Sequence, residues 1–328
     1  MDYTIRFATK EDTDALMHFI DEYWRKNHIL SRDRELFLWQ YGNSTERLNI
    51  VIGIDEEKRI QGMLGFVPYD TGDNKDFALA LWKANPGTGF LGIKLLKYLM
   101  EEEPHREIVC PGINMDTTSK IYEHVGMKVG NMTQWYRLSP RDSYVIGKIE
   151  DNSIPKIANY NKTIRFSKIN NIEELRDLLK DYKGTPHKSI EYLNKRYFIH
   201  PRYAYIPYGV TNETDNTVAA LMLRIQEYGG SRILRLIDCI GDVENLRYIT
   251  DRIDDLLVEL NCEYIDCYEA GIDDEIMTEA GWRRVEEGGN IIPDYFAPFE
   301  HRKVDIHYAT SSPAAILFKG DGDQDRPN

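Results

Sequence analysis

The chain has 328 residues, enough for two domains of ordinary size, and 42% of its residues are hydrophobic, a typical share for a globular protein. Its 54 acidic residues exceed its 41 lysines and arginines, so the formal net charge is −13, which disfavours the basic surface that nucleic-acid binding requires. The sequence contains no run of 18 apolar residues and no export leader, so we expect no membrane segment and a cytoplasmic protein.

Periodicity and turn signals predict the elements of the first half. The signal Thr9-Lys10-Glu11-Asp12 is typical of a helix start, and the leucines of 90–102 recur at the spacing of a helix that packs on a sheet. We expect strands at 3–8, 48–55, 59–69, 76–84, 106–113 and 133–138, and helices beginning near residue 9 and at 34–41, 90–102 and 117–125. The strand at 133–138 is expected to close the first sheet.

The second half repeats this order. Residues 119–128 and 274–283 both read as a short helix, a glycine and a strand, with Gly126 and Gly281 at equivalent places. We expect strands at 163–167, 203–211, 218–227, 231–239 and 263–268, and helices at 171–182, 189–198, 243–260 and 274–280. The sequence therefore predicts two domains of one α/β fold (α+β, with a mixed sheet in each), at 1–140 and 161–328, joined by a linker at 141–160.

A glycine-rich loop, Pro86-Gly87-Thr88-Gly89-Phe90-Leu91-Gly92, lies between the strand at 76–84 and the helix at 90–102. Glycines let backbone N–H groups converge, and a helix N-terminus adds partial positive charge, a combination that suits a pyrophosphate. The loop matches neither the NTPase phosphate loop nor the dinucleotide-binding fingerprint, and a plain tight turn is the alternative.

In this context the chain resembles the GNAT superfamily of acyl-CoA-dependent N-acyltransferases. The resemblance rests on the glycine loop and on Tyr122, which stands four residues before Gly126-Met127. It implies two tandem GNAT-like domains, acetyl-CoA or another acyl-CoA as co-substrate, and Tyr122 as the general acid that protonates the departing thiolate. The implied CoA-binding residues are Leu81, Trp82, Lys83, Gly87, Thr88, Gly89, Phe90, Leu91, Gly92 and Asn114. Asn114 stands eight residues before the tyrosine, where the family tends to have seven.

The second copy differs where the chemistry would be. Its loop carries one glycine followed by carboxylates, Gly241-Asp242-Val243-Glu244, which would repel a pyrophosphate, and Met277 replaces the tyrosine. We therefore expect the second domain to be degenerate for CoA. No general base is identified: a water molecule is one candidate, and the others are His18, His28, Glu22, Glu35 and Asp116.

Cysteines, arginines and the C-terminal end complete the prediction. The four cysteines are scattered without metal-ligand spacing, so we expect buried thiols in a reducing compartment and no metal site; they are Cys110, Cys239, Cys262 and Cys267. Five arginines are expected at solvent-facing positions, with a local basic pocket as the alternative; they are Arg196, Arg202, Arg224, Arg232 and Arg235. The acidic end, 318–328, is expected to be a solvated tail, although it could dock into the cleft between the domains.

These observations favour an enzyme that moves an acyl group, acetyl by preference, from acyl-CoA to an amine of a small polar acceptor such as an amino sugar or a nucleotide-linked amino sugar. The ending and the tyrosine-rich second half are similar to tandem GNAT-like proteins of bacterial surface-polysaccharide or nonulosonic-acid pathways. The first alternative is a tandem-GNAT aminoacyl transferase that uses charged tRNA, and the net charge of −13 speaks against it. The second is a binding module without catalysis. Neither nucleic acid nor a membrane is an expected partner, and the oligomeric state is left open.

Overall fold

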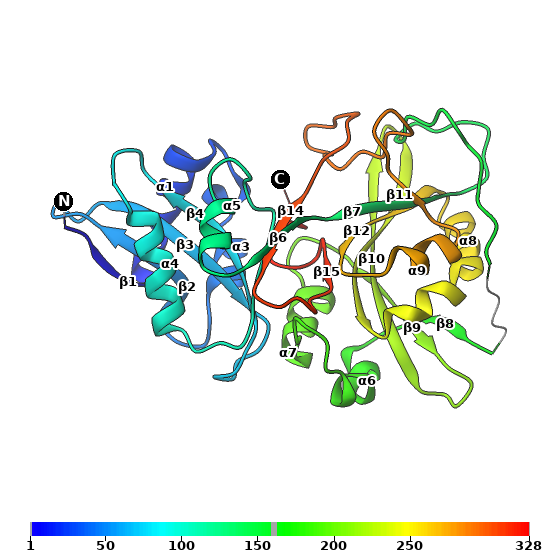
Figure 1. The fold of residues 1–328 in the computed structure, drawn as a ribbon, viewed down its shortest axis with the longest axis horizontal. Helices are drawn as coiled ribbons and strands as arrows, with labels where there is room; N and C mark the ends of the chain where they lie inside the picture. The colour runs from blue at the N-terminus through cyan, green and yellow to red at the C-terminus, as the bar shows by residue number, and fades with distance from the viewer. Residues whose placement is uncertain (1, 159–162, 328) are drawn as a thin grey trace.

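A computed structural model describes residues 2–158 and 163–327, and it contains two mixed sheets side by side (Figure 1). Positions 159–160 of the predicted linker, 161–162 of the predicted second domain and residue 328 lie outside the described residues. The N-terminus lies at the far end of the first sheet, and the C-terminal end lies between the two sheets. The predicted α/β class is confirmed, with one mixed sheet in each half of the molecule.

The first sheet has seven strands and carries helices on both faces. Its order is β1 (Thr4–Thr9), β2 (Arg47–Ile54), β3 (Ile60–Pro68), β4 (Phe77–Ala84), β5 (Ile108–Pro111), β14 (His307–Thr310) and β6 (Lys128–Asn131). Helices α1 (Thr13–Phe19), α2 (Ile29–Arg32) and α3 (Arg34–Tyr41) pack on one face, and α4 (Leu91–Glu102) and α5 (Ser119–His124) pack on the other. The predicted apolar stripe of α4 is fully buried against the sheet, as its helical spacing requires.

The second sheet repeats this plan. Its order is β13 (Arg283–Arg284), β7 (Thr133–Leu138), β12 (Cys262–Ala270), β11 (Ser231–Gly241), β10 (Thr217–Tyr228), β9 (Ile206–Thr211) and β8 (Arg165–Lys168), and β15 (Leu317–Phe318) also pairs with β12. Helices α8 (Thr250–Glu259) and α9 (Asp274–Glu279) share one core with this sheet. Helices α6 (Arg176–Asp181) and α7 (Ile190–Leu193) lie toward the first sheet, and α7 runs into a π-helical turn, η4 (Asn194–Phe198).

The two sheets exchange a strand. The expectation that 133–138 closes the first sheet was wrong: β7 pairs with β12 from Tyr264↔Leu138 to Glu269↔Thr133, in the second sheet. In return β14, from the C-terminal part of the chain, inserts between β5 and β6 in the first sheet (Figure 1). Each sheet therefore needs a strand from the other half of the chain, and one apolar core contains residues of both.

The C-terminal end is buried, which corrects the expectation of a solvated tail. Asp321, Asp323 and Asp325 are each at most 5% exposed. The Arg224 guanidinium donates to Asp325 at 2.6 Å, and the Lys188 ammonium lies 2.9 Å from Asp321. We call residues 319–327 the docked tail; the alternative of docking in the cleft between the two halves is the one that the structure shows.

The arginine expectation was wrong at three of its five positions. Arg196, Arg224 and Arg235 are at most 5% exposed, whereas Arg202 and Arg232 are exposed. Arg224 and Arg235 stand directly opposite each other on β10 and β11, and the face that they share is covered by the docked tail and by Asp294. The docked tail and Asp294 thus bury strand positions that the alternation of polar and apolar residues would place in solvent.

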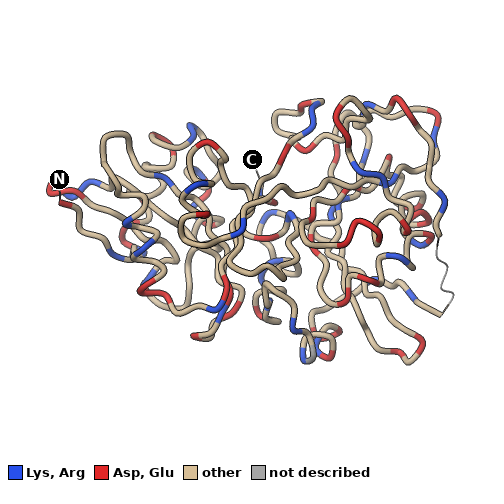
Figure 2. Tube along the Cα trace, in the orientation of Figure 1, with Lys and Arg blue, Asp and Glu red and all other residues tan. Residues whose placement is uncertain are grey.

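Other features of the chain agree with its composition. All four cysteines are buried free thiols, as predicted. Figure 2 shows basic and acidic residues interspersed along both halves. Among residues 2–158 and 163–327, no helix combines the length and the apolar character that crossing a membrane demands.

Candidate acyl-transfer site

Strands β4 and β5 run parallel but pair over a very short distance. The pairs are Phe77↔Ile108 and Ala78↔Val109, after which the described residues of the two strands no longer pair. A bulge then bends β4, because β3 pairs at Ala80 and at Lys83 with an irregular register between them. Leu81 lies in this bulge with φ = 50°, an uncommon conformation for a branched residue. The sheet is therefore split at the carboxyl ends of these two strands.

The glycine-rich loop borders this split. Gly87 and Gly89 have φ = 81° and 62°, and a Cβ atom on either would meet no atom within 4 Å. Two bonds fix the loop: Asn85 N–H donates to the Gln61 carbonyl at 2.9 Å, and the Thr88 hydroxyl donates to the Asn85 carbonyl at 2.6 Å. The left-handed conformations explain why glycine stands here, and the open surroundings leave the backbone accessible to a ligand.

Helix α4 begins at Leu91, within this glycine-rich segment, and its N-cap residue Phe90 offers no capping side chain. The Trp82 indole donates to the Gly92 carbonyl at 3.2 Å, which ties β4 to the first turn of the helix. The Leu91 side chain is buried in the core, whereas Phe90 is 76% exposed. The predicted loop residues are thus brought together at one helix N-terminus, where the partial positive charge suits an anion.

Tyr122 lies on α5 beside the same split. Its ring contacts Trp82 edge to face, with the ring centroids 5.5 Å apart, and its hydroxyl interacts with the Cys110 thiol of β5. The side chain is 3% exposed. Burial raises the pKa of Tyr122 well above its usual value, and burial raises the pKa of Cys110 to about 12, so both groups keep their protons near neutral pH.

Asn114 is not gathered with the other predicted residues. It follows β5, is exposed, and its amide oxygen accepts from the backbone N–H groups of Asp116 at 2.9 Å and Thr117 at 3.0 Å. That oxygen therefore serves the turn that leads into α5.

A cavity of about 400 Å³ lies beyond the carboxyl end of β5. Gly112 and Ile113 line it from the first sheet, and the docked tail, β10 and β11 line it from the other side. Its walls carry charges of both signs: Arg224, Arg235, Lys319 and Asp325 are buried, and the Asp294 side chain is 7% exposed. The sequence offered a local basic pocket with Arg224 and Arg235 only as an alternative, and it did not predict the neutralising carboxylates, because these come from distant segments.

One predicted base candidate lies near the docked tail. His28 is 6% exposed, and its Nδ1 accepts from the Leu30 N–H at 3.2 Å. Burial, with a contribution from Arg326 of the tail, lowers the pKa of His28 to about 4, so the ring is neutral at pH 7. Glu35 instead pairs with Arg202 at 2.7 Å, and His18 lines a separate cavity with Lys58 and Arg59.

The equivalent split in the second sheet is filled. Beyond the last parallel pair of β11 and β12, Lys319 N–H donates to the Tyr268 carbonyl at 3.2 Å and Gly320 N–H donates to the Ile237 carbonyl at 2.7 Å. A Cβ atom on Gly241 would lie 2.4 Å from the Val218 carbonyl oxygen, so that loop is closed. Met277 is buried in the core.

Solved structures share this fold over nearly the whole chain. A GCN5-related N-acetyltransferase from Anabaena variabilis matches with a TM-score of 0.57 at 12% identity, covering 94% of this chain and 72% of that one. A protein from Enterococcus faecalis described as a probable N-acyltransferase also matches with a TM-score of 0.57, at 8% identity and the same coverages. The chain has the fold of the GCN5-related N-acetyltransferases.

The glucosamine N-acetyltransferase region of a fungal multi-domain β-N-acetylglucosaminidase matches with a TM-score of 0.50 at 11% identity, covering 94% of this chain and 38% of that one. No model of a protein family and no curated protein matches the sequence. The split between β4 and β5 and the loop before α4 lie in the first half of the chain, in which the sequence analysis predicted an acyl-CoA site.

Proposed function

We propose that the protein is an N-acyltransferase that moves an acyl group, acetyl by preference, from acyl-CoA to an amine of a small polar acceptor. One observation carries the proposal: the parallel pair β4 and β5 separates after two residue pairs, directly beside an open glycine loop and an uncapped helix N-terminus. The backbone N–H groups of 87–92 hold the pyrophosphate of the acyl-CoA substrate, and the acyl arm enters the split.

The chemistry follows from this placement. The acceptor amine attacks the thioester carbon, the C–N bond forms and the C–S bond breaks, and the thiolate takes a proton from the Tyr122 hydroxyl. Because burial keeps that hydroxyl protonated, it is able to act as the acid. A water molecule takes the proton that the amine releases and returns a proton to the Tyr122 oxygen, so the acid is restored.

The acceptor enters through the cavity beyond β5. Its charged walls suit a polar acceptor that bears hydroxyl, amine or acidic groups, and the resemblance in fold to a glucosamine N-acetyltransferase region supports an amino sugar. The second sheet takes no acyl-CoA, because the chain itself occupies the corresponding split. We also infer that nucleic acid is no partner, since the net charge is −13.

Calorimetric titration with acetyl-CoA tests the proposal. The wild type should bind, and Gly87→Glu should abolish binding because a carboxylate then meets the pyrophosphate. Gly288→Glu is the matched control, since Gly288 also has positive φ and open surroundings, and it should bind like the wild type. Tyr122→Phe should retain binding and lose about 10²–10⁴-fold in turnover. A wild type that does not bind millimolar acetyl-CoA would refute the assignment.

The burial of Tyr122 favours one other candidate, a binding module without catalysis. In such a module the Tyr122 side chain, which is 3% exposed and whose hydroxyl interacts with the Cys110 thiol, would stay in the core and meet no substrate. The module predicts no acetyl-CoA binding by the wild type, so the same titration separates the two functions.

A further inference from the structure

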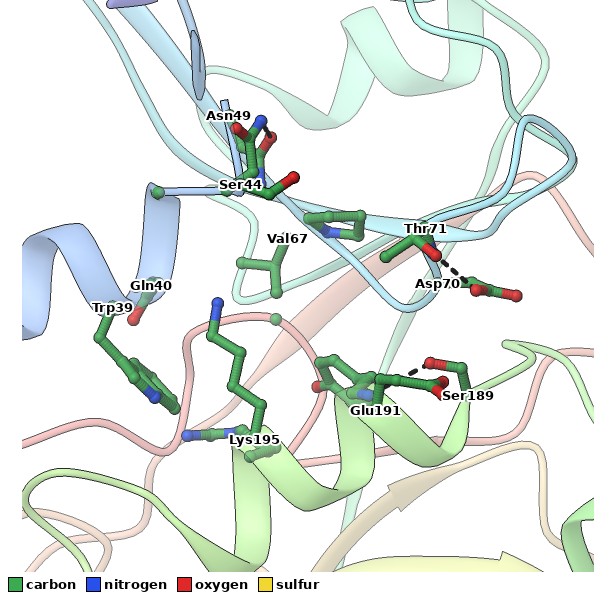
Figure 3. A pocket seen from close by; sticks show the side chains of 16 residues that line it. Trp39, Gln40, Ser44, Asn49, Val67, Asp70, Thr71, Ser189, Glu191 and Lys195 are labelled. Atoms are coloured by element: carbon green, nitrogen blue, oxygen red, sulfur yellow. Dashed lines mark hydrogen bonds between the residues drawn. The ribbon is translucent and has the colours of Figure 1, made fainter. Parts of the chain in front are cut away.

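A second cavity, of about 250 Å³, opens on the other side of the docked tail (Figure 3). It lies where α3, the start of β2, the end of β3 and the α7–η4 helix meet, so both halves of the molecule build it. Gly322 of the tail lines this cavity, whereas Gln324 and Asp325 line the acceptor cavity. The tail therefore separates the two spaces, and the acyl-transfer proposal assigns nothing to this one.

Lys195 extends into this cavity from η4 (Figure 3). Glu191 stands four residues earlier, the spacing at which helical carboxylates and amines pair, yet no ion pair joins the two, and Figure 3 shows Lys195 directed away from it. The ammonium lies instead 5.4 Å from the centroid of the Trp39 ring. Burial alone lowers the pKa of Lys195, so no carboxylate compensates for its loss of water.

Other groups of the lining also lack partners. The Tyr192 hydroxyl, the Arg196 Nε and the Trp39 indole nitrogen are buried atoms without a hydrogen-bond partner among the described residues. All three are able to donate, and Arg196 uses its other end to donate to the Asp325 carbonyl at 2.7 Å. Unpaired buried donors are rare and costly, so the residues beside Lys195 surround the cavity with positive and hydrogen-bond-donating groups, which favours a ligand that accepts hydrogen bonds.

The remaining lining limits the size and charge of that ligand. Val67, Pro68 and the Trp39 ring give the cavity a largely apolar wall that suits a compact organic body. Asp70 and Glu191 also line it, and neither makes an ion pair among the described residues. Their carboxylates disfavour a ligand with several negative charges, such as a nucleotide.

We propose that this cavity binds a small organic monocarboxylate, with the carboxylate on the Lys195 ammonium and the apolar body against Trp39 and Val67. A single negative charge supplies the partner that Lys195 lacks. This site goes beyond acyl transfer, and none of its residues belongs to the CoA loop.

Benzoate and its uncharged counterpart benzamide are suitable probes, titrated into the full chain by calorimetry. The wild type should bind benzoate at least about tenfold more tightly than benzamide, since a charge-assisted bond to an ammonium is worth more than a neutral one. Lys195→Met should remove that preference while benzamide binding changes little. Lys168→Met, at an exposed position of β8, is the control and should retain the preference.

Melting temperatures show whether the variants remain folded. Lys195→Met should melt no lower than the wild type, because it removes a partly buried ammonium that no carboxylate compensates. Benzoate should raise the melting temperature of the wild type but not of this variant. Lys195→Gln repeats the removal of charge with a polar side chain. Equal binding of benzoate and benzamide by the wild type, or undiminished benzoate binding by both variants, would overturn the site, whatever the outcome with acetyl-CoA.

Discussion

Replacing Lys188 with methionine tests how the docked tail is held. Its ammonium lies 2.7 Å from Asp238 of β11 and 2.9 Å from Asp321 of the tail, and all three side chains are at most 2% exposed. The Tyr69 hydroxyl donates to Asp321 at 2.9 Å, and the Tyr197 hydroxyl donates to Asp238 at 2.7 Å. The cluster thus joins the first sheet, the second sheet and the tail around one cation.

The expected cost of Lys188→Met is about 3–5 kcal/mol, because the variant leaves two buried carboxylates without their cation. This is a large share of the roughly 5–15 kcal/mol that stabilises a typical domain. In the wild type, burial opposes the charged form of Lys188, but the two carboxylates raise its pKa above its usual value. That stabilisation is fully present at every pH below the ordinary lysine pKa, including pH 7, and is lost only as the pH rises through the raised value.

The variant should behave differently with pH. Burial already raises the pKa of Asp321, and loss of the cation raises it further, so the folded variant takes up a proton as the pH falls. The cost of the substitution should therefore be smaller at pH 5 than at pH 8, because protonation removes one of the two facing charges.

Urea unfolding at pH 5 and pH 8 measures these effects in Lys188→Met, in Asp321→Asn and in the double variant. The double variant should recover at least about 1 kcal/mol relative to the sum of the two single changes, since both act on one cluster. Lys168→Met is the control and should cost less than about 0.5 kcal/mol. Additive single effects, or a cost of Lys188→Met that does not depend on pH, would refute the reasoning.

Two further substitutions test the interior of the molecule. Burial raises the pKa of Glu269 to about 7, although the Trp135 indole donates to it at 2.9 Å. Between the ordinary pKa of a glutamate and this raised value, the folded chain keeps a proton on Glu269 that the unfolded chain loses. The stability of the wild type should therefore fall relative to that of Glu269→Gln by about 3 kcal/mol as the pH rises from about 4.5 to about 7, at about 1.4 kcal/mol per pKa unit. Parallel pH profiles of the two proteins in urea unfolding would contradict this. Gly130→Val tests the strand exchange, because a Cβ atom there would lie 2.8 Å from the Tyr308 ring of β14. Gly130→Val should lower the free energy of unfolding by about 1–3 kcal/mol and speed amide exchange in β14. Gly72→Val, in open surroundings, should do neither. Equal behaviour of the two variants would mean that β14 does not lie beside β6.

Local patterns predicted much of the architecture. The leucines of α4 recur at helical spacing, and the structure buries all four against the sheet. The equivalent glycines Gly126 and Gly281 both follow a short helix with positive φ, 86° and 76°. Helical periodicity and left-handed turns depend on near neighbours in the chain, so one sequence is enough to reveal them.

The local structure around the glycine loop was also predicted, whereas its role in binding acyl-CoA stays a prediction. The strand–glycine–helix order placed the loop at 87–92 at a helix N-terminus, and the structure gathers Trp82, Gly92 and Tyr122 beside it. The sequence did not show that β4 and β5 separate after two pairs, because strand divergence depends on the pairing of residues some thirty positions apart.

The sequence by itself determined the repeat, most of the helices and strands, and the position of the glycine loop before α4, because these depend on adjacent residues. Only the tertiary structure decided which sheet receives β7 and β14, and that the acidic end is buried. Arg224 and Arg235 alternate with apolar residues, as on a solvated strand face, and only a tail more than 80 residues away supplies Asp325 to bury Arg224. The physical reason is that burial of a charge depends on a partner brought close in space, and no local pattern records that partner.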